Sequence, residues 1–233
     1  MQIVVLAGGL AAPVRPGADQ TLASLRMVQG RPFIDWQLDC FVASGARNVI
    51  LCVGYLGEQI ETHVKRALDR GLVVGYSYDG AERVGTGGAL RRAFARLDDE
   101  FVLTYGDRYL PFDYAAPLHD LRAHPEAVAT MSVYKSRGQL GSNDVALDGD
   151  WVVKYEKGAV DAALDGIDGG ALALRRSALA DIEEGAVWGI EALLRKLVRK
   201  RQLRAFVAPE RCYEIGSPEG LSDLERHLAG QPG

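Results

Sequence analysis

Three short stretches of the chain are apolar at almost every position, and they constrain its fold more than any other feature. They are IVVLA at residues 3–7, VILCV at 49–53 and FVLTY at 101–105. An unbroken apolar run of this length is typical of a strand that is buried on both faces, as in a parallel sheet covered by helices. The three runs therefore predict the centre of a parallel sheet.

The segments between these runs have the spacing of amphipathic helices. Apolar residues recur every three or four positions in a helix expected from Pro32 to a stop at Gly45, and again over 57–70 and 86–97. Strand and helix therefore alternate three times, which predicts an α/β fold with a doubly wound sheet. The 233 residues fit one such domain with a small addition.

The second half of the chain is less regular, but four elements can be predicted in it. Residues 127–134 favour a strand, and 145–155 favour a hairpin around the Asp-Gly-Asp turn at 148–150. Residues 190–200 have the spacing of an amphipathic helix, whose basic face we interpret as solvent-exposed. Ser217 and Pro218 are expected to begin a last helix, as its N-cap and first residue.

Composition argues against several classes of protein. A net charge of −4 and a pI of about 5.6 disfavour nucleic acid as the main partner. The three cysteines form no CxxC pair, which suits a reducing cytoplasm better than a disulfide scaffold. No apolar stretch approaches the roughly 18–20 residues of a membrane span, and no signal peptide is evident, so we expect a cytoplasmic protein with no membrane partner.

Two glycine clusters and one acid mark an expected ligand cleft. Gly8 and Gly9 follow the first strand, where they would let backbone N–H groups approach a ligand. The stretch VGTGGAL (84–90) opens a helix, whose unpaired N–H groups favour an anion. Asp107 follows the central strand, where a carboxylate can hold a divalent cation against phosphates. Each feature also has a plainer interpretation as a turn.

The well-known nucleotide motifs are not matched. The P-loop ends in Gly-Lys-Ser/Thr, which GGLAAPVR (8–15) does not contain. The dinucleotide fingerprint fails as well, because Gly8 and Gly9 are followed by LAAP (10–13). Asp107 is followed by Arg108 and Tyr109, so the D-x-D acid pair common in glycosyltransferases is missing from this position. Each mismatch disfavours one class of protein: P-loop nucleotide-binding proteins, dinucleotide-binding proteins or metal-dependent glycosyltransferases.

Eight stretches together resemble the sugar-phosphate nucleotidyltransferases, also called NDP-sugar pyrophosphorylases. They follow the family's order over nearly the whole chain, and three of them (GTGGAL, YGD and EIGSPEGL) are most similar to the short bacterial branch that includes D-glycero-D-manno-heptose 1-phosphate guanylyltransferase. The eight are LAGG (6–9), GRPFIDWQLD (30–39), VGYLGEQI (53–60), GTGGAL (85–90), YGDRYL (105–110), YEKG (155–158), IDGGAL (167–172) and YEIGSPEGL (213–221).

The resemblance implies a fold and a reaction. The implied fold is a Rossmann-like, doubly wound mixed sheet of the nucleotide-diphospho-sugar transferase type, with a smaller sugar-binding region. A single domain would span 1–233, with 1–110 mainly binding the nucleotide and 111–233 mainly the sugar phosphate. The implied reaction transfers NMP, and GMP in the most similar branch, from an NTP to a heptose or hexose 1-phosphate with release of pyrophosphate. A homodimer is the default expectation.

The resemblance also implies roles for individual residues. Asp107 and Glu214 would bind Mg²⁺, Lys157 would orient the attacking phosphate, and Arg15 falls on a second arginine of the family's loop. No side-chain general base is needed, because a sugar phosphate is already ionised and catalysis is mostly positioning and charge neutralisation. The residues expected to contact the substrates are Ala7, Gly8, Gly9, Thr86, Gly87, Gly88, Gly106, Asn143, Glu156 and Asp168.

One loop departs from the family pattern, because its signature arginine falls on Pro13 and its signature lysine on Ala23. Losing one preorganised charge can cost roughly 10²–10³ in rate. Three hypotheses follow: an active enzyme in which Arg15, or less effectively Arg26, compensates; a catalytically degraded regulatory or sensor paralogue that binds nucleotide sugars; and a metal-dependent glycosyltransferase of related fold. We favour the active enzyme, because the two acids, Lys157 and the glycine clusters are all present.

Overall fold

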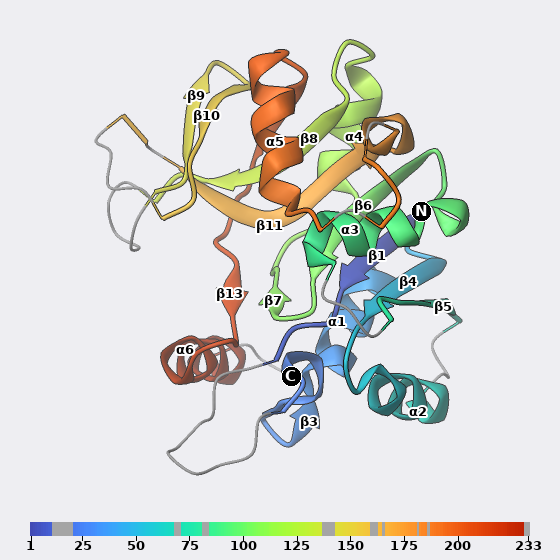
Figure 1. The fold of residues 1–233 in the computed structure, drawn as a ribbon. Coiled ribbons are helices and arrows are strands. Elements are labelled where there is room, and N and C mark those ends of the chain that lie inside the picture. The colour runs from blue at the N-terminus through green and yellow to red at the C-terminus, as the bar shows by residue number, and fades with distance from the viewer. Residues whose placement is uncertain are drawn as a thin grey trace.

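A computed structural model describes residues 1–10, 21–67, 71–80, 84–136, 143–158, 163–164, 166–180, 182–185 and 187–230. Within these residues the central feature is a nine-stranded sheet of order β5-β4-β1-β6-β11-β8-β12-β10-β9 (Figure 1). Two short two-stranded sheets, β2-β3 and β7-β13, lie beside it.

The first four strands of the sheet are parallel, and they include the three predicted apolar runs. They are β5 (Val73–Tyr78), β4 (Asn48–Val53), β1 (Gln2–Leu6) and β6 (Glu100–Tyr105). The sequence did not predict β5, because this strand lies at the edge of the sheet and only Ser77 of its residues is fully buried. A half-exposed edge strand has no continuous apolar run to reveal it.

The remaining strands make the sheet mixed. Strand β11 (Ile167–Arg175) runs antiparallel between β6 and β8 (Ala129–Tyr134), and β12 (Leu203–Val207) is parallel to β8. The hairpin of β9 (Val145–Asp148) and β10 (Trp151–Tyr155) completes the order and confirms the hairpin prediction. The sequence analysis missed β11, in which two glycines accompany a register shift between Asp168 and Leu172.

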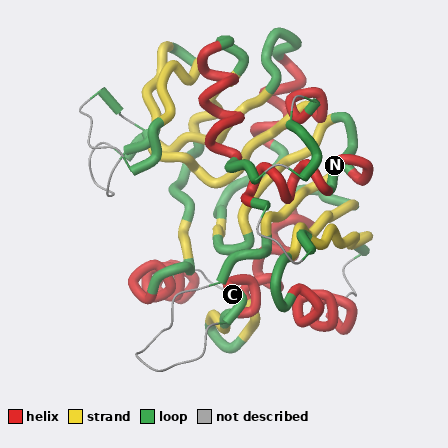
Figure 2. The backbone as a smooth tube through the Cα atoms, in the orientation of Figure 1, coloured by secondary structure: helices red, strands yellow, loops and turns green. Residues whose placement is uncertain are grey.

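Helices cover both faces of the sheet (Figures 1 and 2). Residues of α3 (Gly85–Arg92) and α5 (Ile190–Arg199) share one core with Val4 of the central strand. Residues of α1 (Phe33–Ala43), α2 (Gly57–Ala67) and α4 (Ala116–Ala123) share the other core with Ile3 and Val5. Successive side chains of β1 are thus buried on opposite faces, which confirms the doubly wound α/β fold.

The predicted helices agree with the structure in type and differ in their ends. Helix α3 begins at Gly85 and stops at Arg92, and a short 3₁₀ turn, η2 (Phe94–Arg96), follows where a continuous helix was expected. Residues 68–70, the predicted end of α2, lie outside the described residues. Among the residues that the structure describes, no helix is both long and apolar enough to cross a membrane.

The C-terminal segment returns to the middle of the molecule and completes the site. Helix α6 (Pro218–Ala229) begins as predicted, since the Ser217 hydroxyl accepts a hydrogen bond from the Gly220 N–H at 3.0 Å. Just before it, β13 (Tyr213–Glu214) pairs with β7 (Arg108–Tyr109). The other short elements are η1 (Ala23–Leu25), β2 (Met27–Val28), β3 (Arg31–Pro32) and η3 (Arg176–Leu179).

Candidate functional site

A cleft of about 790 Å³, which we call the glycine cleft, opens at the carboxyl ends of the parallel strands β1, β4, β5 and β6. This is the edge at which open α/β sheets bind ligands. Six of the predicted site residues line it: Ala7, Gly8, Gly9, Thr86, Gly106 and Asp107. The others that line it are Leu6, Leu10, Ala23, Ser24, Cys52, Gly54, Tyr55, Asp79, Gly80, Val84, Gly85, Ala89 and Tyr105.

Two glycines make the floor of this cleft a backbone surface. A Cβ atom on Gly8 would lie 3.2 Å from the Gly54 nitrogen, and one on Gly106 would lie 2.8 Å from the Ala7 Cα and 2.5 Å from the Ser24 Oγ. A side chain at Gly106 would therefore force neighbouring atoms apart. The ends of adjacent strands approach closely because these positions carry no side chain, and peptide groups are left facing the cleft.

The second glycine cluster makes hydrogen bonds to a segment far along the chain. The N–H groups of Gly87 and Gly88 both donate to the Trp188 carbonyl, at 2.8 and 3.2 Å, and the Thr86 hydroxyl accepts from the Ile190 N–H at 2.8 Å. The first turn of α3 therefore holds the segment that leads into α5. The N–H groups of Gly87 and Gly88 are therefore not free for an anion, and neither residue lines the glycine cleft, whereas Gly85 and Thr86 do. A contact of this stretch with a nucleotide stays a prediction.

Asp107 lies in a turn that the rest of the fold holds in place. The Gln37 side chain of α1 donates to the carbonyls of Tyr105 and Arg108, both at 2.8 Å, and so spans the turn. The Ile215 N–H donates to the Asp107 carbonyl at 3.0 Å, which ties the turn to the C-terminal segment. The partly exposed carboxylate thus projects into the cleft from a fixed backbone.

The structure brings Glu214 and Asp107 together. Glu214 is the register partner of Arg108 in the β13–β7 pair, one residue along from Asp107. A Cβ atom on Gly216 would lie 2.9 Å from Glu214 Oε2 and 3.7 Å from Asp107 Oδ2, so the two oxygens can be no farther apart than these distances added. Both carboxylates therefore border the same small space, as a shared ion requires.

Glu214 is also attached to the start of α6, a contact that the sequence did not predict. Its Oε2 accepts from the N–H groups of Gly216 and Ser217, at 2.7 and 3.3 Å, and its Oε1 accepts from the Ser217 hydroxyl at 2.5 Å. These bonds come from the first residues of a helix, where donors to a carboxylate are favourable, and they fix the direction of the Glu214 side chain.

The two carboxylates fit a magnesium ion that takes its remaining ligands from substrate. Mg²⁺ is commonly held by one or two carboxylates together with waters and substrate phosphates. In the part of the chain that the structure describes, no group of three or more His, Cys, Asp or Glu side chains could hold a metal ion by itself. Asp107 and Glu214 thus provide a partial site, and metal binding by them stays a prediction.

On the far side of Asp107 lies a group of charged and aromatic side chains around Asp168. Asp168 Oδ1 accepts from the Gly170 N–H at 2.9 Å, and Oδ2 accepts from the Tyr155 hydroxyl at 3.3 Å. Burial raises the pKa of this carboxyl, while the Gly170 N–H and the charges of Arg108 and Lys157 oppose the rise. The charges of two cations therefore act on one half-buried acid, and of these two Arg108 was not predicted as a site residue.

The other residues predicted to contact the sugar phosphate differ in whether their side chains are free to bind it. Lys157 and Glu156 are exposed, and Glu156 Oε2 lies 3.7 Å from the Lys154 ammonium. Asn143 is already engaged, since its Oδ1 accepts from the Ser136 hydroxyl and its Nδ2 donates to the Leu164 carbonyl, both at 2.7 Å. Asn143 therefore joins two backbone segments.

Of the two cations proposed to replace the family's loop charges, the structure describes only Arg26, which does not line the cleft. Arg15 and Pro13 lie outside the described residues. Arg26 is only 6% exposed, and its Nη1 donates to the Ile215 carbonyl at 2.5 Å, so it braces the backbone beside Glu214. None of the described residues that line the glycine cleft is a lysine or an arginine.

Asp79 is a cleft residue that the sequence analysis missed. It follows β5 and lines the glycine cleft, and burial raises the pKa of its carboxyl to about 6, although the charge of Arg92 opposes the rise. Its Oδ1 is buried, and no residue that the structure describes forms a hydrogen bond with it, while its Oδ2 lies 3.4 Å from where a Cβ on Gly8 would be. The rule that marked Asp107, an acid just after a strand, would have found it had β5 been predicted.

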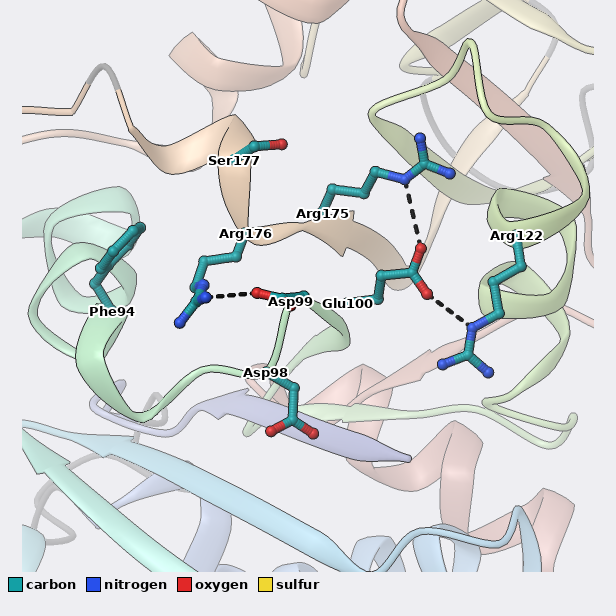
Figure 3. Close-up of a pocket in the computed structure, with 8 residues that line it drawn as sticks. All are labelled: Phe94, Asp98, Asp99, Glu100, Arg122, Arg175, Arg176 and Ser177. Carbon is teal, nitrogen blue, oxygen red and sulfur yellow. Dashed lines mark hydrogen bonds and ion pairs between the residues drawn. The ribbon is translucent and has the colours of Figure 1, made fainter.

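A second pocket, of about 750 Å³, lies at the amino end of β6 (Figure 3). We call it the arginine pocket, because three arginines and three acids make up most of its lining. Its full lining is Phe94, Asp98, Asp99, Glu100, Arg122, Arg175, Arg176 and Ser177. No motif of the sequence pointed to it.

Comparison with known proteins shows which proteins the chain is similar to. It is 23% identical over 219 residues to the D-glycero-alpha-D-manno-heptose 1-phosphate guanylyltransferase of Campylobacter jejuni, an alignment that covers 94% of this chain and 96% of that protein. It is 26% identical over 237 residues to the glucose-1-phosphate cytidylyltransferase of Salmonella typhimurium, covering 90% and 88%. Over nearly its whole length the chain is thus similar to sugar-phosphate nucleotidyltransferases.

Solved structures agree on the fold. The crystal structure of HddC from Yersinia pseudotuberculosis, complexed with GMP-PN, superposes with a TM-score of 0.80 at 21% identity, over 97% of this chain and 99% of that one. No protein-family model matches the chain. The resemblance to the sugar-phosphate nucleotidyltransferases and their mixed α/β fold are thus confirmed. The relatives carry the names of guanylyl and cytidylyl transferases, so relationship alone does not select the base.

Proposed function

We propose that this protein transfers GMP from GTP to a heptose or hexose 1-phosphate and releases pyrophosphate. The observation that carries the proposal is the convergence of Asp107 and Glu214 on one small space beside the glycine cleft. A nucleotide in that cleft would lie on the peptide groups of Gly8 and Gly9, with its phosphates directed toward the two acids. The similarity to sugar-phosphate nucleotidyltransferases over most of the chain supports the same reaction.

The chemistry needs little from the protein beyond positioning and charge. Both substrates are anions, so the barrier falls when their repulsion is neutralised and the reacting atoms are aligned. Asp107 and Glu214 are the residues that would hold Mg²⁺, and the ion when bound neutralises charge on the nucleotide phosphates. The hydrogen bonds from the start of α6 fix the direction of the Glu214 carboxylate, while Lys157 and Asp168 would orient the sugar phosphate.

Asp79 supports guanine as the base. A carboxylate accepts two hydrogen bonds side by side, and guanine presents its N1–H and its 2-amino group on one edge. Uracil and thymine flank their single N–H with carbonyl oxygens, which a carboxylate repels. Asp79 and Asp107 are the two acids among the described residues that line the glycine cleft, and no described residue forms a hydrogen bond with Asp79 Oδ1. Its position therefore favours a base that offers two donors.

The direct test is pyrophosphate release with Mg²⁺, using GTP, CTP, UTP and dTTP against a panel of hexose and heptose 1-phosphates. We expect release with GTP and at least one sugar 1-phosphate, and much less with the pyrimidine nucleotides. No release with any pair would overturn the proposal. Tight binding of a nucleotide sugar without turnover would instead favour the sensor hypothesis, and activity that appears only in the Pro13→Arg, Ala23→Lys double variant would do the same.

A further inference from the structure

The glycine cleft leaves a problem of charge. Its described lining contains the acids Asp79 and Asp107 and no lysine or arginine, and Ala23 stands where the family's loop has its lysine. The proposed reaction brings a triphosphate and a sugar phosphate together at this place. Preorganised positive charge stabilises such anions, so another cation near Asp107 is needed to replace the ones that the loop has lost.

Arg108 lies at the boundary between the two substrate regions. Its Nε is 3.8 Å from Asp107 Oδ1, on the nucleotide side. On the other side its Nη1 contacts the Cys212 Sγ at 3.6 Å, and that sulfur lies 3.8 Å from the Asp168 carbonyl. The side chain is 29% exposed, so part of the guanidinium remains open to solvent.

The guanidinium of Arg108 has unused hydrogen-bonding capacity. An arginine carries five N–H donors, and among the described residues this one makes a single side-chain hydrogen bond, to a sulfur, which is a weak acceptor. Arg204 is a useful contrast, because its Nε and Nη2 both donate to the Asp120 carboxylate at 3.1 Å. Donors without oxygen partners are suited to a phosphate, which accepts two of them in parallel.

A second cation faces the same place. The charges of both Arg108 and Lys157 act on the half-buried Asp168 carboxyl, although the two residues are about fifty positions apart in the chain. Burial by itself would lower the pKa of Arg108, but the surrounding Cys212, Asp107 and Asp168 raise it. Asp168 is thus a counter-charge that the two cations share.

We propose that Arg108 binds the phosphate of the sugar 1-phosphate together with Lys157, and so supplies positive charge where the two anionic substrates meet. This inference rests on the proposed function. Arg26 does not fill the role, because it is buried against the Ile215 carbonyl. The sequence analysis gave Arg108 no role, since it is only the middle position of Asp107-Arg108-Tyr109, where Tyr109 takes the place of the second acid of a D-x-D motif.

The test compares Arg108→Met, Arg108→Lys and the wild type, with Arg122→Met as a matched control. Arg122 is also an arginine beside an acid, at 2.8 Å from Glu100, but it belongs to the arginine pocket. Steady-state kinetics with GTP should show KM for the sugar 1-phosphate raised about 10- to 100-fold in Arg108→Met, since a hydrogen bond to a charged group contributes on that scale. The KM for GTP should change far less, and Arg122→Met should behave as wild type.

A second readout does not need turnover. Calorimetric titration with mannose 1-phosphate and glucose 1-phosphate, in Mg²⁺, should show binding by the wild type that Arg108→Met weakens and Arg108→Lys partly keeps. Added guanidinium ion should partly restore an Arg108→Ala variant, which a purely structural arginine would not allow. Should Arg108→Met fail to fold, as judged by circular dichroism, Arg108→Lys carries the comparison.

The outcomes separate this inference from the proposed function. Wild-type turnover with unchanged constants in Arg108→Met overturns the role of Arg108 and leaves the proposed function intact. Arg108-dependent binding of the sugar phosphates by a chain that turns over no nucleotide supports the role and overturns the proposed function. A wild type that neither binds nor reacts overturns both.

Discussion

The glycine cleft and the arginine pocket have similar volumes, about 790 and 750 Å³, but they arrange their charges in opposite ways. In the arginine pocket, Arg176 lies 2.5 Å from Asp99, while Arg122 and Arg175 lie 2.8 and 3.5 Å from the two oxygens of Glu100 (Figure 3). In the glycine cleft, Asp79 has a buried oxygen with no partner, and no described lining residue is a cation.

This difference suggests that the charged side chains of the arginine pocket stabilise the fold, and that the carboxylates of the glycine cleft bind a ligand. In the arginine pocket the guanidinium groups also reach backbone carbonyls: Arg175 bonds those of Pro125 and Leu121, and Arg176 bonds that of Leu97. Their bonding is largely satisfied within the chain. An uncompensated buried carboxylate is costly, so its presence in a cleft points to a partner supplied from outside.

The largest effect should come from Asp107. We expect Asp107→Asn to reduce the rate of pyrophosphate release by at least about 10²–10³, because it removes a preorganised charge at the reacting phosphates. Asp99→Asn is the matched control, since Asp99 is 87% exposed and belongs to the arginine pocket. Equal losses in the two variants would remove the distinction between the pockets.

The substitution Asp79→Asn should change the nucleotide preference of the glycine cleft, which no substitution in the arginine pocket should do. An amide offers one acceptor and one donor, so the variant should lose preference for GTP over UTP by roughly 10- to 100-fold, the scale of one good paired contact. Competition binding with the four nucleotides measures this directly. A variant that keeps the wild-type preference would show that Asp79 does not contact the base.

The raised pKa of Asp79 adds a pH dependence with a definite sign. In the folded chain this carboxyl titrates at about 6, against an ordinary value of 3.8, so between about pH 4 and 6 the folded state holds more protons than the unfolded state. Its contribution to the free energy of unfolding is therefore present at pH 4 and is lost as the pH rises through 6. Urea denaturation should show wild type losing stability relative to Asp79→Asn from pH 4 to 7.

Ser217→Ala should have a moderate effect on both stability and metal use. The hydroxyl caps α6 and also donates to Glu214 Oε1. Loss of an N-cap costs about 1 kcal/mol, and without this donor the Glu214 carboxylate is less firmly aimed. We expect a lower melting temperature and a higher Mg²⁺ concentration for half-maximal activity. A fall in melting temperature with unchanged Mg²⁺ dependence would make Ser217 a cap only.

The sequence predicted the central strands and most helices. Strands buried on both faces appear as continuous apolar runs, and amphipathic helices appear as apolar residues at every third or fourth position. It also predicted that Asp107 and Glu214 meet, through the family resemblance. It failed where position depends on partners far along the chain. Nothing local shows that the Gly87 and Gly88 N–H groups bond the Trp188 carbonyl, or that Asn143 is engaged by its neighbours. Asp79 was missed because its strand is an edge strand.

The smallest effect should come from Arg122→Met. A small effect would support a purely structural role for the arginine pocket. Arg122 is 51% exposed and pairs only through Nε with Glu100, a carboxylate that Arg175 also neutralises. Exposed ion pairs of this kind contribute about 0–1 kcal/mol, so the free energy of unfolding should fall by no more than that and kcat/KM should be unchanged. A marked loss of activity at normal stability would mean that the arginine pocket, although its charges are paired, communicates with the reaction. In that case charge pairing would no longer distinguish a structural pocket from a functional one in this fold.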